Sequence, residues 1–248
     1  MAASRFPGKP LYQILGKPML EHVYLRAKLY PHWDQLIVAT CDKEIEDFCN
    51  SKNIPCIQTG NHHVRALDRV AEAYLKTNTL PNPEDLVICV QGDEPMLHPD
   101  MIKVVIDPLL DSKDIPATVL SIHIIEEEMW KNPDIVKIIH NNNGEILYTS
   151  RVPLPYAKNG FTPELMARRV AGIFGFRWKY LEIFTNHEET RLEKLEACDS
   201  NRVLDLNFRQ YIAPYPGIKS YSVDSPIDIQ YVEKYLVEDP LYQRYCHE

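Results

Sequence analysis

The first half of the chain alternates between continuous apolar runs and segments whose apolar residues recur every three or four positions. Continuous runs are typical of strands buried in a parallel sheet, and the recurring pattern is typical of amphipathic helices. The predicted order is a helix at 18–29, a strand at 36–40, a helix through Ile45 and Cys49, a strand at 54–58, a helix from Leu67 to Tyr74 and a strand at 86–90. Such alternation predicts an α/β fold of the Rossmann-like kind, with a mostly parallel, doubly wound sheet.

The second half of the chain adds a hairpin and an extended arm. The elements expected there are a helix at 101–110, a strand at 117–123, a hairpin with strands at 135–139 and 145–148, a strand at 170–177, and helices at 178–185 and 191–205. Pro226 suits the first position of a final helix, with Ser225 or Asp224 as its N-cap. We interpret residues 1–248 as one domain, in which residues 130–170 form a dimerisation-type hairpin and Pro-rich arm.

The run at 86–90 ends abruptly in Gln91-Gly-Asp-Glu-Pro95. Asp93 therefore follows the carboxyl end of a central strand, which is the edge where open α/β sheets bind ligands. A carboxylate there can hold Mg²⁺, which usually binds one or two carboxylates together with substrate phosphates. The alternative is a plain turn with solvated acids, and the run alone favours neither.

Arg5 and Lys9 flank a Pro-Gly pair in a loop near the amino terminus. Their cations could cradle phosphate, although a basic loop at a terminus is more often a solvated tail. If this loop, Asp93 and Asp224 met at one edge of the sheet, two carboxylates and two cations would fit a Mg²⁺-nucleotide site. The alternative role for Asp224 is that of a simple N-cap.

Composition narrows the class of protein. A net charge of −8 argues against a nucleic-acid-binding protein, which normally presents a basic face. The six cysteines form no C-x-x-C pair, which indicates reduced thiols in a cytoplasmic enzyme rather than a disulfide scaffold. We expect no membrane insertion, because no apolar run approaches the length of a membrane span.

Several motifs, taken in order, resemble the 3-deoxy-manno-octulosonate (Kdo) cytidylyltransferase family, also called CMP-Kdo synthetases. The resemblance covers nearly the whole chain. Two of its motifs are specific in combination, the S-R-x-P-G-K-P-L loop and Q-G-D-E-P. The matching segments are Ser4-Arg-Phe-Pro-Gly-Lys-Pro-Leu11, Gln91-Gly-Asp-Glu-Pro95, Tyr148-Thr-Ser-Arg151, Gly172-Ile-Phe-Gly-Phe-Arg177 and Val223-Asp-Ser-Pro226.

The resemblance implies a homodimeric, Mg²⁺-dependent nucleotidyltransferase that serves lipopolysaccharide synthesis. The anomeric hydroxyl of an acidic sugar would attack the α-phosphate of CTP and release pyrophosphate. Positioning and charge neutralisation would do most of the catalysis. By position, the resemblance implies catalytic roles for Lys9, Asp93 and Asp224, metal ligation by Asp93 and Asp224, and nucleotide binding by Ser4, Arg5, Lys9 and Gln91.

The chain departs from the family pattern where the family handles its acceptor sugar. The family's S-G-T-[DE]-R is Arg65-Ala-Leu-Asp-Arg69 here, a histidine is replaced by Val170, and E-Q-L-R becomes Asp199-Ser-Asn-Arg202. Losing hydroxyl and imidazole donors while gaining a cation should change which acceptor binds well. The candidate acceptor-binding residues are Arg65, Asp68, Arg69, Arg151 and Asp199.

Other interpretations stay open at the level of sequence. The acceptor could be Kdo, another sugar acid, or a phosphonate or phosphate, and the chain could be a non-catalytic nucleotide-binding relative. The family has a strand and an I-P-A-R segment before the basic loop, so we expect the working protein to begin upstream of Met1. A transition-metal site at His62 and His63 is a minor alternative, because adjacent side chains diverge in a helix or strand.

Overall fold

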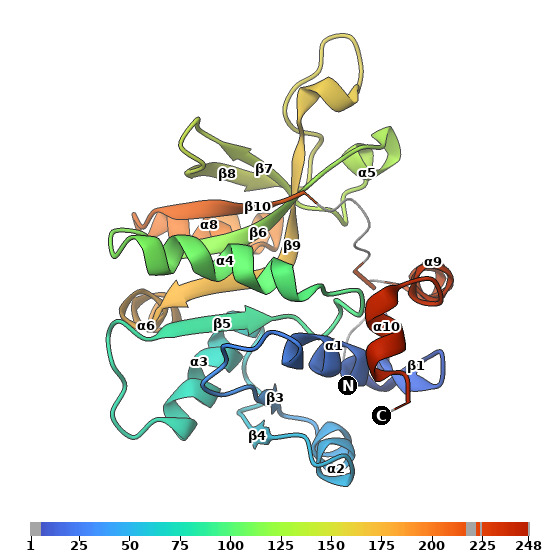
Figure 1. Cartoon of the computed structure of the whole chain (residues 1–248). Coiled ribbons are helices and arrows are strands. Elements are labelled where there is room, and N and C mark those ends of the chain that lie inside the picture. The colour runs from blue at the N-terminus through green and yellow to red at the C-terminus, as the bar shows by residue number, and fades with distance from the viewer. Residues whose placement is uncertain (1–5, 217–221, 224, 248) are drawn as a thin grey trace. The chain divides into compact units, whose positions relative to one another are not determined.

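The computed structural model describes residues 6–216, 222–223 and 225–247 (Figure 1). The chain divides into two compact units. Unit 1 comprises Met1–Thr77, Val90–Lys103 and Lys219–Glu248, and unit 2 comprises Asn78–Cys89 and Val104–Ile218. The single-domain organisation expected from the sequence stays a prediction, and each unit is described by itself.

Unit 1 combines short strands with five complete helices in the described residues. Its elements are η1 (Lys9–Leu11), β1 (Gln13–Ile14), β2 (Lys17–Pro18), α1 (Met19–Lys28), β3 (Val38–Thr40), α2 (Lys43–Ser51), β4 (Cys56–Gln58), α3 (Ala66–Thr77), the first residues of α4 (Pro99–Asp111), α9 (Pro226–Leu236) and α10 (Pro240–Tyr245). β3 and β4 pair in parallel, whereas β1 and β2 form a small antiparallel ribbon.

The core of unit 1 forms where α1 and α9 bury their apolar faces. Met19, Val23 and Ala27 are buried on α1, as their helical spacing predicts. One cluster joins Ile14 and Met19 to apolar residues of α9, among them Val232. α9 begins at Pro226, as expected, and the N–H of Ser225 donates to Asp228 Oδ2 at 2.7 Å.

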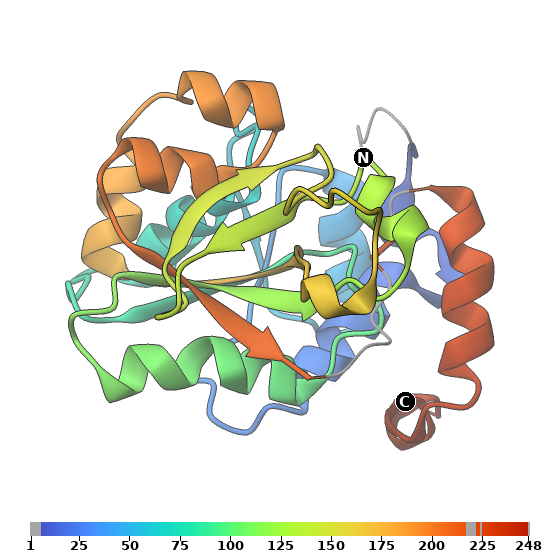
Figure 2. The same ribbon diagram turned by 90° about the horizontal axis from the view of Figure 1, so that it is seen from above.

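Unit 2 is built on a six-stranded sheet in which β10, β6, β9, β7 and β8 follow one another and β5 also pairs with β9. Figure 2 gives a second view of this sheet and its β7–β8 hairpin. The elements of unit 2 are β5 (Leu86–Val90, except its last residue), the end of α4, β6 (Ala117–His123), α5 (Glu127–Lys131), β7 (Lys137–His140), β8 (Ile146–Ser150), η2 (Pro163–Leu165), β9 (Arg168–Arg177), α6 (Trp178–Thr185), α7 (Arg191–Glu196), α8 (Asp199–Asp205) and β10 (Gln210–Tyr215).

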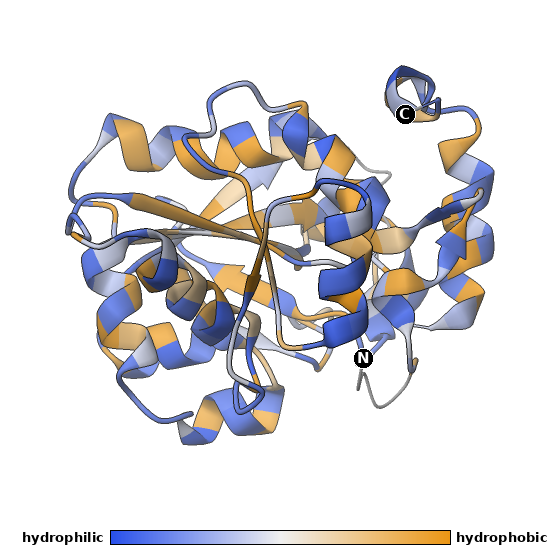
Figure 3. Cartoon of the chain, turned by 90° about the horizontal axis from the view of Figure 1, so that it is seen from below, coloured by the Kyte–Doolittle hydropathy of each residue, from blue (hydrophilic) through white to orange (hydrophobic). Residues whose placement is uncertain are grey.

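The α/β fold is confirmed, but the sheet of unit 2 is mixed rather than mostly parallel. β10 runs parallel to β6, whereas β9 runs antiparallel to β6 and to β7. The chain returns from β6 to β9 through a hairpin and an arm, without the single crossover helix that a parallel pairing needs. The strands are dominated by hydrophobic residues, while the helices carry both kinds (Figure 3).

Two elements of unit 2 differ from the sequence expectation. β10 was not expected, because Pro214 interrupts its pattern; in the described sheet β10 pairs along its length only with β6, an edge position where proline is tolerated. The single helix expected at 191–205 is two helices, since Ala197 adopts a left-handed φ of 46° between them.

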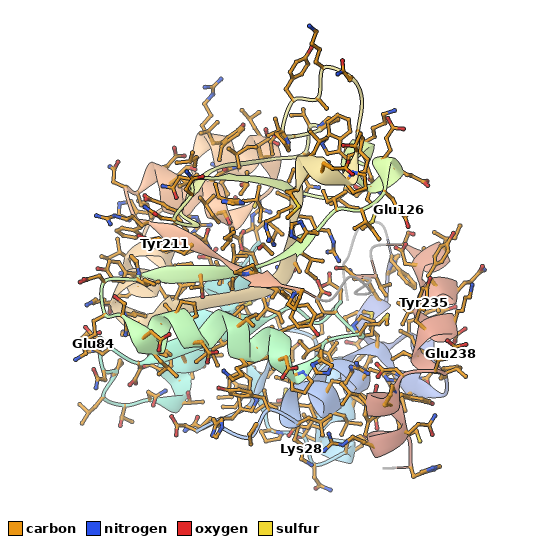
Figure 4. The ribbon with its side chains drawn as sticks, turned by 45° about the horizontal axis from the view of Figure 1, so that its top comes forward. Lys28, Glu84, Glu126, Tyr211, Tyr235 and Glu238 are labelled. Carbon is orange, nitrogen blue, oxygen red and sulfur yellow. The ribbon has the colours of Figure 1, made fainter. Side chains whose placement is uncertain are left out.

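Ion pairs and a backbone hydrogen bond connect the residues just before β5 with the end of β9 and the start of α6. Glu84, labelled in Figure 4, accepts from Lys179 Nζ at 2.6 Å and from Arg177 Nη1 at 3.3 Å. The N–H of Trp178 donates to the carbonyl of Asp85 at 2.8 Å. Within the described part of the chain, no helix has the length and apolarity needed to cross a membrane.

Candidate functional site

Lys9 joins three separate segments of unit 1. Its Nζ donates to Asp93 Oδ2 at 2.9 Å and to the carbonyl of Val223 at 2.8 Å. The N–H of Val223 in turn donates to the carbonyl of Asp93 at 2.9 Å. Lys9 of the basic loop, Asp93 in the turn after β5 and Val223 before α9 therefore lie together.

The Asp93 carboxylate keeps one oxygen available. Its Oδ2 is paired with Lys9, whereas Oδ1 is buried and has no hydrogen-bond partner within the described residues. An unpaired buried carboxylate oxygen is costly unless a cation or donor satisfies it. Asp93 thus fits the role of a ligand to a hard divalent cation, since carboxylate oxygens are the ligands that such ions prefer.

Three predicted residues of the nucleotide site, Ser4, Arg5 and Asp224, lie outside the described residues. Val223, next to Asp224 in sequence, contacts both Lys9 and Asp93. Gln91, which is also predicted to bind the nucleotide, is partly exposed just before the turn that contains Asp93.

The segment that follows Asp93 is anchored by buried polar groups. Arg26 of α1 is 1% exposed, and its Nε donates to the carbonyl of Leu97 while Nη2 donates to Asp239 Oδ2 at 2.7 Å. Ser222 Oγ donates to Glu94 Oε1 at 2.6 Å. Sequence reasoning missed Arg26 because a cation on a helix is usually solvent-exposed; its place one turn from Val23 on the apolar stripe was the available signal.

His22 adds a second buried contact between α1 and the carboxyl-terminal helix. Its Nε2 faces the carbonyl of Ile14 at 2.8 Å, and its Nδ1 lies 3.0 Å from the hydroxyl of Tyr245. The carbonyl can only accept, so the partners place the proton of neutral His22 on Nε2 and make Nδ1 the acceptor. Burial lowers the pKa of His22 below its usual value.

The predicted acceptor residues of unit 1 lie around the loop before α3. Arg65 and Asp68 are partly exposed at the start of this helix. Arg69 points back into the loop, where it donates to Thr59 Oγ1 and to the carbonyl of Gly60 at 3.2 Å. Arg69 therefore holds the loop together, and acceptor binding by these three residues stays a prediction.

Of the two predicted acceptor residues of unit 2, one is hydrogen-bonded to backbone carbonyls and the other is buried. Arg151 donates through its side chain to four backbone carbonyls, at 2.6 to 3.2 Å, including that of Glu196. This network gives Arg151 a structural role between β8 and α7. Asp199 begins α8 and is only 7% exposed. Neither arrangement tests acceptor binding, which stays a prediction for both.

Sequence reasoning also missed a cationic group at one edge of the sheet in unit 2. Arg168 opens β9 opposite His123, the last residue of β6. Its Nη2 lies 2.9 Å from His123 Nε2, and its Nη1 donates to Ser121 Oγ at 3.3 Å. Desolvation, followed by the charge of Arg168, lowers the pKa of His123, so the neutral imidazole accepts. Two-residue periodicity was the available signal, because it puts Arg168 and Val170 on one face.

Comparison with known proteins gives consistent matches. Residues 1–210 match the family model described as cytidylyltransferase. A curated 3-deoxy-manno-octulosonate cytidylyltransferase of Nitratidesulfovibrio vulgaris is 36% identical over 96% of this chain and 93% of its own length. Another, of Oleidesulfovibrio alaskensis, is 34% identical over 93% of this chain and 90% of its own length.

A solved structure extends the similarity to three dimensions. CMP:2-keto-3-deoxy-manno-octonic acid synthetase, complexed with CTP, superposes with a TM-score of 0.83 at 28% identity. The superposition covers 96% of this chain and 95% of that one.

Proposed function

Because this chain belongs to the cytidylyltransferase family, we propose that it transfers CMP from CTP to the anomeric hydroxyl of Kdo or a related sugar acid, releasing pyrophosphate. The curated relatives carry the name of this reaction, and the similar solved structure was obtained with CTP. The observation that carries the proposal is the meeting of Lys9, Asp93 and Val223 in unit 1.

In the proposed reaction the acceptor oxygen attacks the α-phosphorus of CTP. A bond forms between that oxygen and phosphorus, and the hydroxyl proton passes to solvent. The bond from the α-phosphorus to the oxygen that bridges the α- and β-phosphates breaks, and its electron pair leaves with pyrophosphate. In this proposal Lys9 would neutralise negative charge on the triphosphate; its Nζ lies 2.8–2.9 Å from Asp93 Oδ2 and the carbonyl of Val223, and its side chain is only 14% exposed. Charge neutralisation of this kind is the main contribution that a protein makes to phosphoryl transfer.

We propose Mg²⁺ as the divalent cation, bound by Asp93 together with Asp224. When bound, the ion would neutralise phosphate charge and orient the triphosphate. Asp93 Oδ1, which is buried without a hydrogen-bond partner in the described residues, would bind it, while Lys9 fixes the orientation of the carboxylate through Oδ2. Asp224 is proposed as the second ligand because it directly follows Val223 in the sequence.

Pyrophosphate release tests the reaction. We expect the protein to release pyrophosphate from CTP with Mg²⁺ and Kdo, and not from ATP, GTP or UTP, or without an acceptor. A panel of other sugar acids, a phosphonate and a phosphate ester would identify the acceptor. Release with none of these acceptors would contradict the enzyme and favour a non-catalytic nucleotide-binding protein.

The second candidate function is transfer of CMP to a different anionic acceptor. The environment of Arg168 is the observation that favours it. Its guanidinium is partly buried, and among the described residues no carboxylate lies within ion-pair distance of it. His123 and Arg168 lie at the carboxyl edge of the parallel pair β6 and β10, where α/β sheets bind ligands. A cation on the same face as Val170, which replaces the family's histidine, suits an acceptor with an additional negative group.

Replacing Arg168 by methionine should raise the KM for the acceptor by about 10- to 100-fold, because a charge-assisted hydrogen bond is lost. The KM for CTP should change little. Steady-state kinetics with each substrate varied would measure both values. Arg191→Met, which removes an exposed arginine of the same unit, is the matched control. Equal acceptor KM values in the two variants would exclude Arg168 from acceptor binding.

We also propose a homodimer that acts in the cytoplasm and supplies an activated sugar for lipopolysaccharide synthesis. The arm after β8 supports the dimer, because Val152 and Tyr156 are 56% and 82% exposed there. Large apolar side chains gathered on one exposed segment are typical of an interaction surface.

A further inference from the structure

The loop between β4 and α3 brings two histidines against a glutamate of α3. His62 and His63 have ring centroids 4.1 Å apart. Each of His62, His63 and Glu72 offers one donor atom, and these atoms all lie within 4.8 Å of one another. Adjacent histidines diverge in a helix or strand, which made a metal site a minor alternative in sequence. His62 and His63 instead lie in an irregular loop, where their rings can approach each other.

Hydrogen bonds and an ion pair hold the Glu72 side chain as an ionised carboxylate. Its two carboxylate oxygens accept from the N–H of Gly60 at 3.1 and 2.9 Å, and Oε1 also lies 2.7 Å from Lys76 Nζ. Lys76 and then the Gly60 N–H lower the pKa of Glu72 to about 2, so the carboxylate is ionised near neutral pH. Its Oε2 also accepts a hydrogen bond from His63 Nε2.

Because Gly60 has no side chain, the His62 ring can occupy the space beside it. A Cβ atom at position 60 would overlap the Cε1 and Nδ1 atoms of His62 and would lie 3.3 Å from Glu72 Oε2. Any side chain at this position would therefore push the imidazole away from the carboxylate. The close approach of His62 to Glu72 depends on a glycine at residue 60.

We propose that His62, His63 and Glu72 form a binding site for a divalent transition-metal ion of the zinc type. Two imidazole nitrogens and one carboxylate oxygen are ligands that Zn²⁺ prefers, and three protein ligands leave one coordination position for water. Bonds of about 2.0–2.2 Å bring tetrahedral ligand atoms to within about 3.5 Å of each other, so a small closure of the exposed His62 side chain completes the set. Binding through His63 Nε2 would require the neutral tautomer that carries its proton on Nδ1, so the proton now between His63 Nε2 and Glu72 Oε2 would move to Nδ1.

The bound ion would stabilise the loop that precedes α3. Arg69 already donates to the carbonyls of Gly60 and His63, at 3.2 and 3.4 Å. An ion bound by these ligands would also link residues 60–63 to Glu72 of α3. This site does not depend on the proposed transferase reaction, because none of its three ligands is assigned a role there.

Calorimetric titration of the chelator-treated protein with Zn²⁺ would test the site, with Co²⁺ absorption as a spectroscopic check on imidazole ligation. We expect one equivalent to bind. We expect His62→Ala to weaken that binding at least about 10-fold, since it removes a direct ligand. Gly60→Ala should weaken it similarly through displacement of the ring. His187→Ala, which removes an exposed histidine of unit 2, is the control and should bind as the wild type does.

His62→Ala keeps the test informative even if Glu72 variants unfold, because the His62 side chain is exposed. Circular dichroism would verify that each variant remains folded. The proposal is overturned if the wild type binds no Zn²⁺ at micromolar concentration. It is equally overturned if His62→Ala and Gly60→Ala bind as tightly as the wild type.

Discussion

Replacing Asp93 by asparagine should reduce pyrophosphate release from CTP by at least about 100- to 1,000-fold, the scale seen when one group that stabilises transition-state charge is removed. The substitution preserves shape but removes the negative charge from Oδ1, the buried oxygen that has no partner within the described residues. It also replaces an ion pair with Lys9 Nζ by a neutral contact at the same 2.9 Å position. A divalent cation would lose its charged ligand, and Lys9 would lose the group that orients it.

Steady-state pyrophosphate assays at several Mg²⁺ concentrations would measure this effect, and thermal unfolding would show whether the variant remains folded. Asp100→Asn is the matched control, because Asp100 is an exposed aspartate in the same unit. We expect that control to retain full activity. Unchanged turnover in Asp93→Asn would remove Asp93 from the metal site and from the proposed mechanism.

Replacing Arg202 by methionine should lower the free energy of unfolding by about 3–5 kcal/mol, which is the usual cost of leaving one member of a buried ion pair alone. Arg202 and Glu193 are 1% and 0% exposed. Two parallel hydrogen bonds of 2.7 Å join the guanidinium Nε and Nη2 to the two carboxylate oxygens. The guanidinium also lies 4.0 Å from the ring centroid of Phe184, so the pair connects α6, α7 and α8.

Urea unfolding followed by circular dichroism would give the change in free energy. The double variant Arg202→Met with Glu193→Leu should recover part of the loss, because it leaves no uncompensated charge in the core. Arg191→Met, which removes an exposed arginine of α7, should leave stability nearly unchanged. A loss below about 1 kcal/mol for Arg202→Met would place the pair among ordinary surface ion pairs.

The fold was largely predictable where one element is governed by its own residues. The helical spacing of Met19, Val23 and Ala27 predicted the buried face of α1, and the apolar run at 86–90 predicted β5. The prediction of secondary structure was weakest where the local pattern of residues did not mark an element or its end. Pro214 concealed β10, and nothing in the local pattern of 191–205 marked the turn at Ala197.

The candidate site was predictable in part for the same reason. The sequence indicated Asp93 because it follows the carboxyl end of an apolar strand, where α/β sheets bind ligands. It indicated Lys9 because this residue lies in a basic loop. The roles of Arg69 and Arg151 were less readable. An arginine in sequence looks the same whether it faces a ligand or donates to backbone carbonyls, as both of these do.

The amino-acid sequence by itself determined the α/β class, most helices and strands, and the motifs shared with cytidylyltransferases. These depend on the period of apolar residues and on short segments, which are local properties of the chain. Only the tertiary structure decided which partners each polar side chain takes. Lys9 meets a carboxylate 84 residues away, and His62 and His63 converge on Glu72 because an irregular loop and Gly60 allow it. Such contacts are set by the packing of distant segments, in which every buried charge needs a partner.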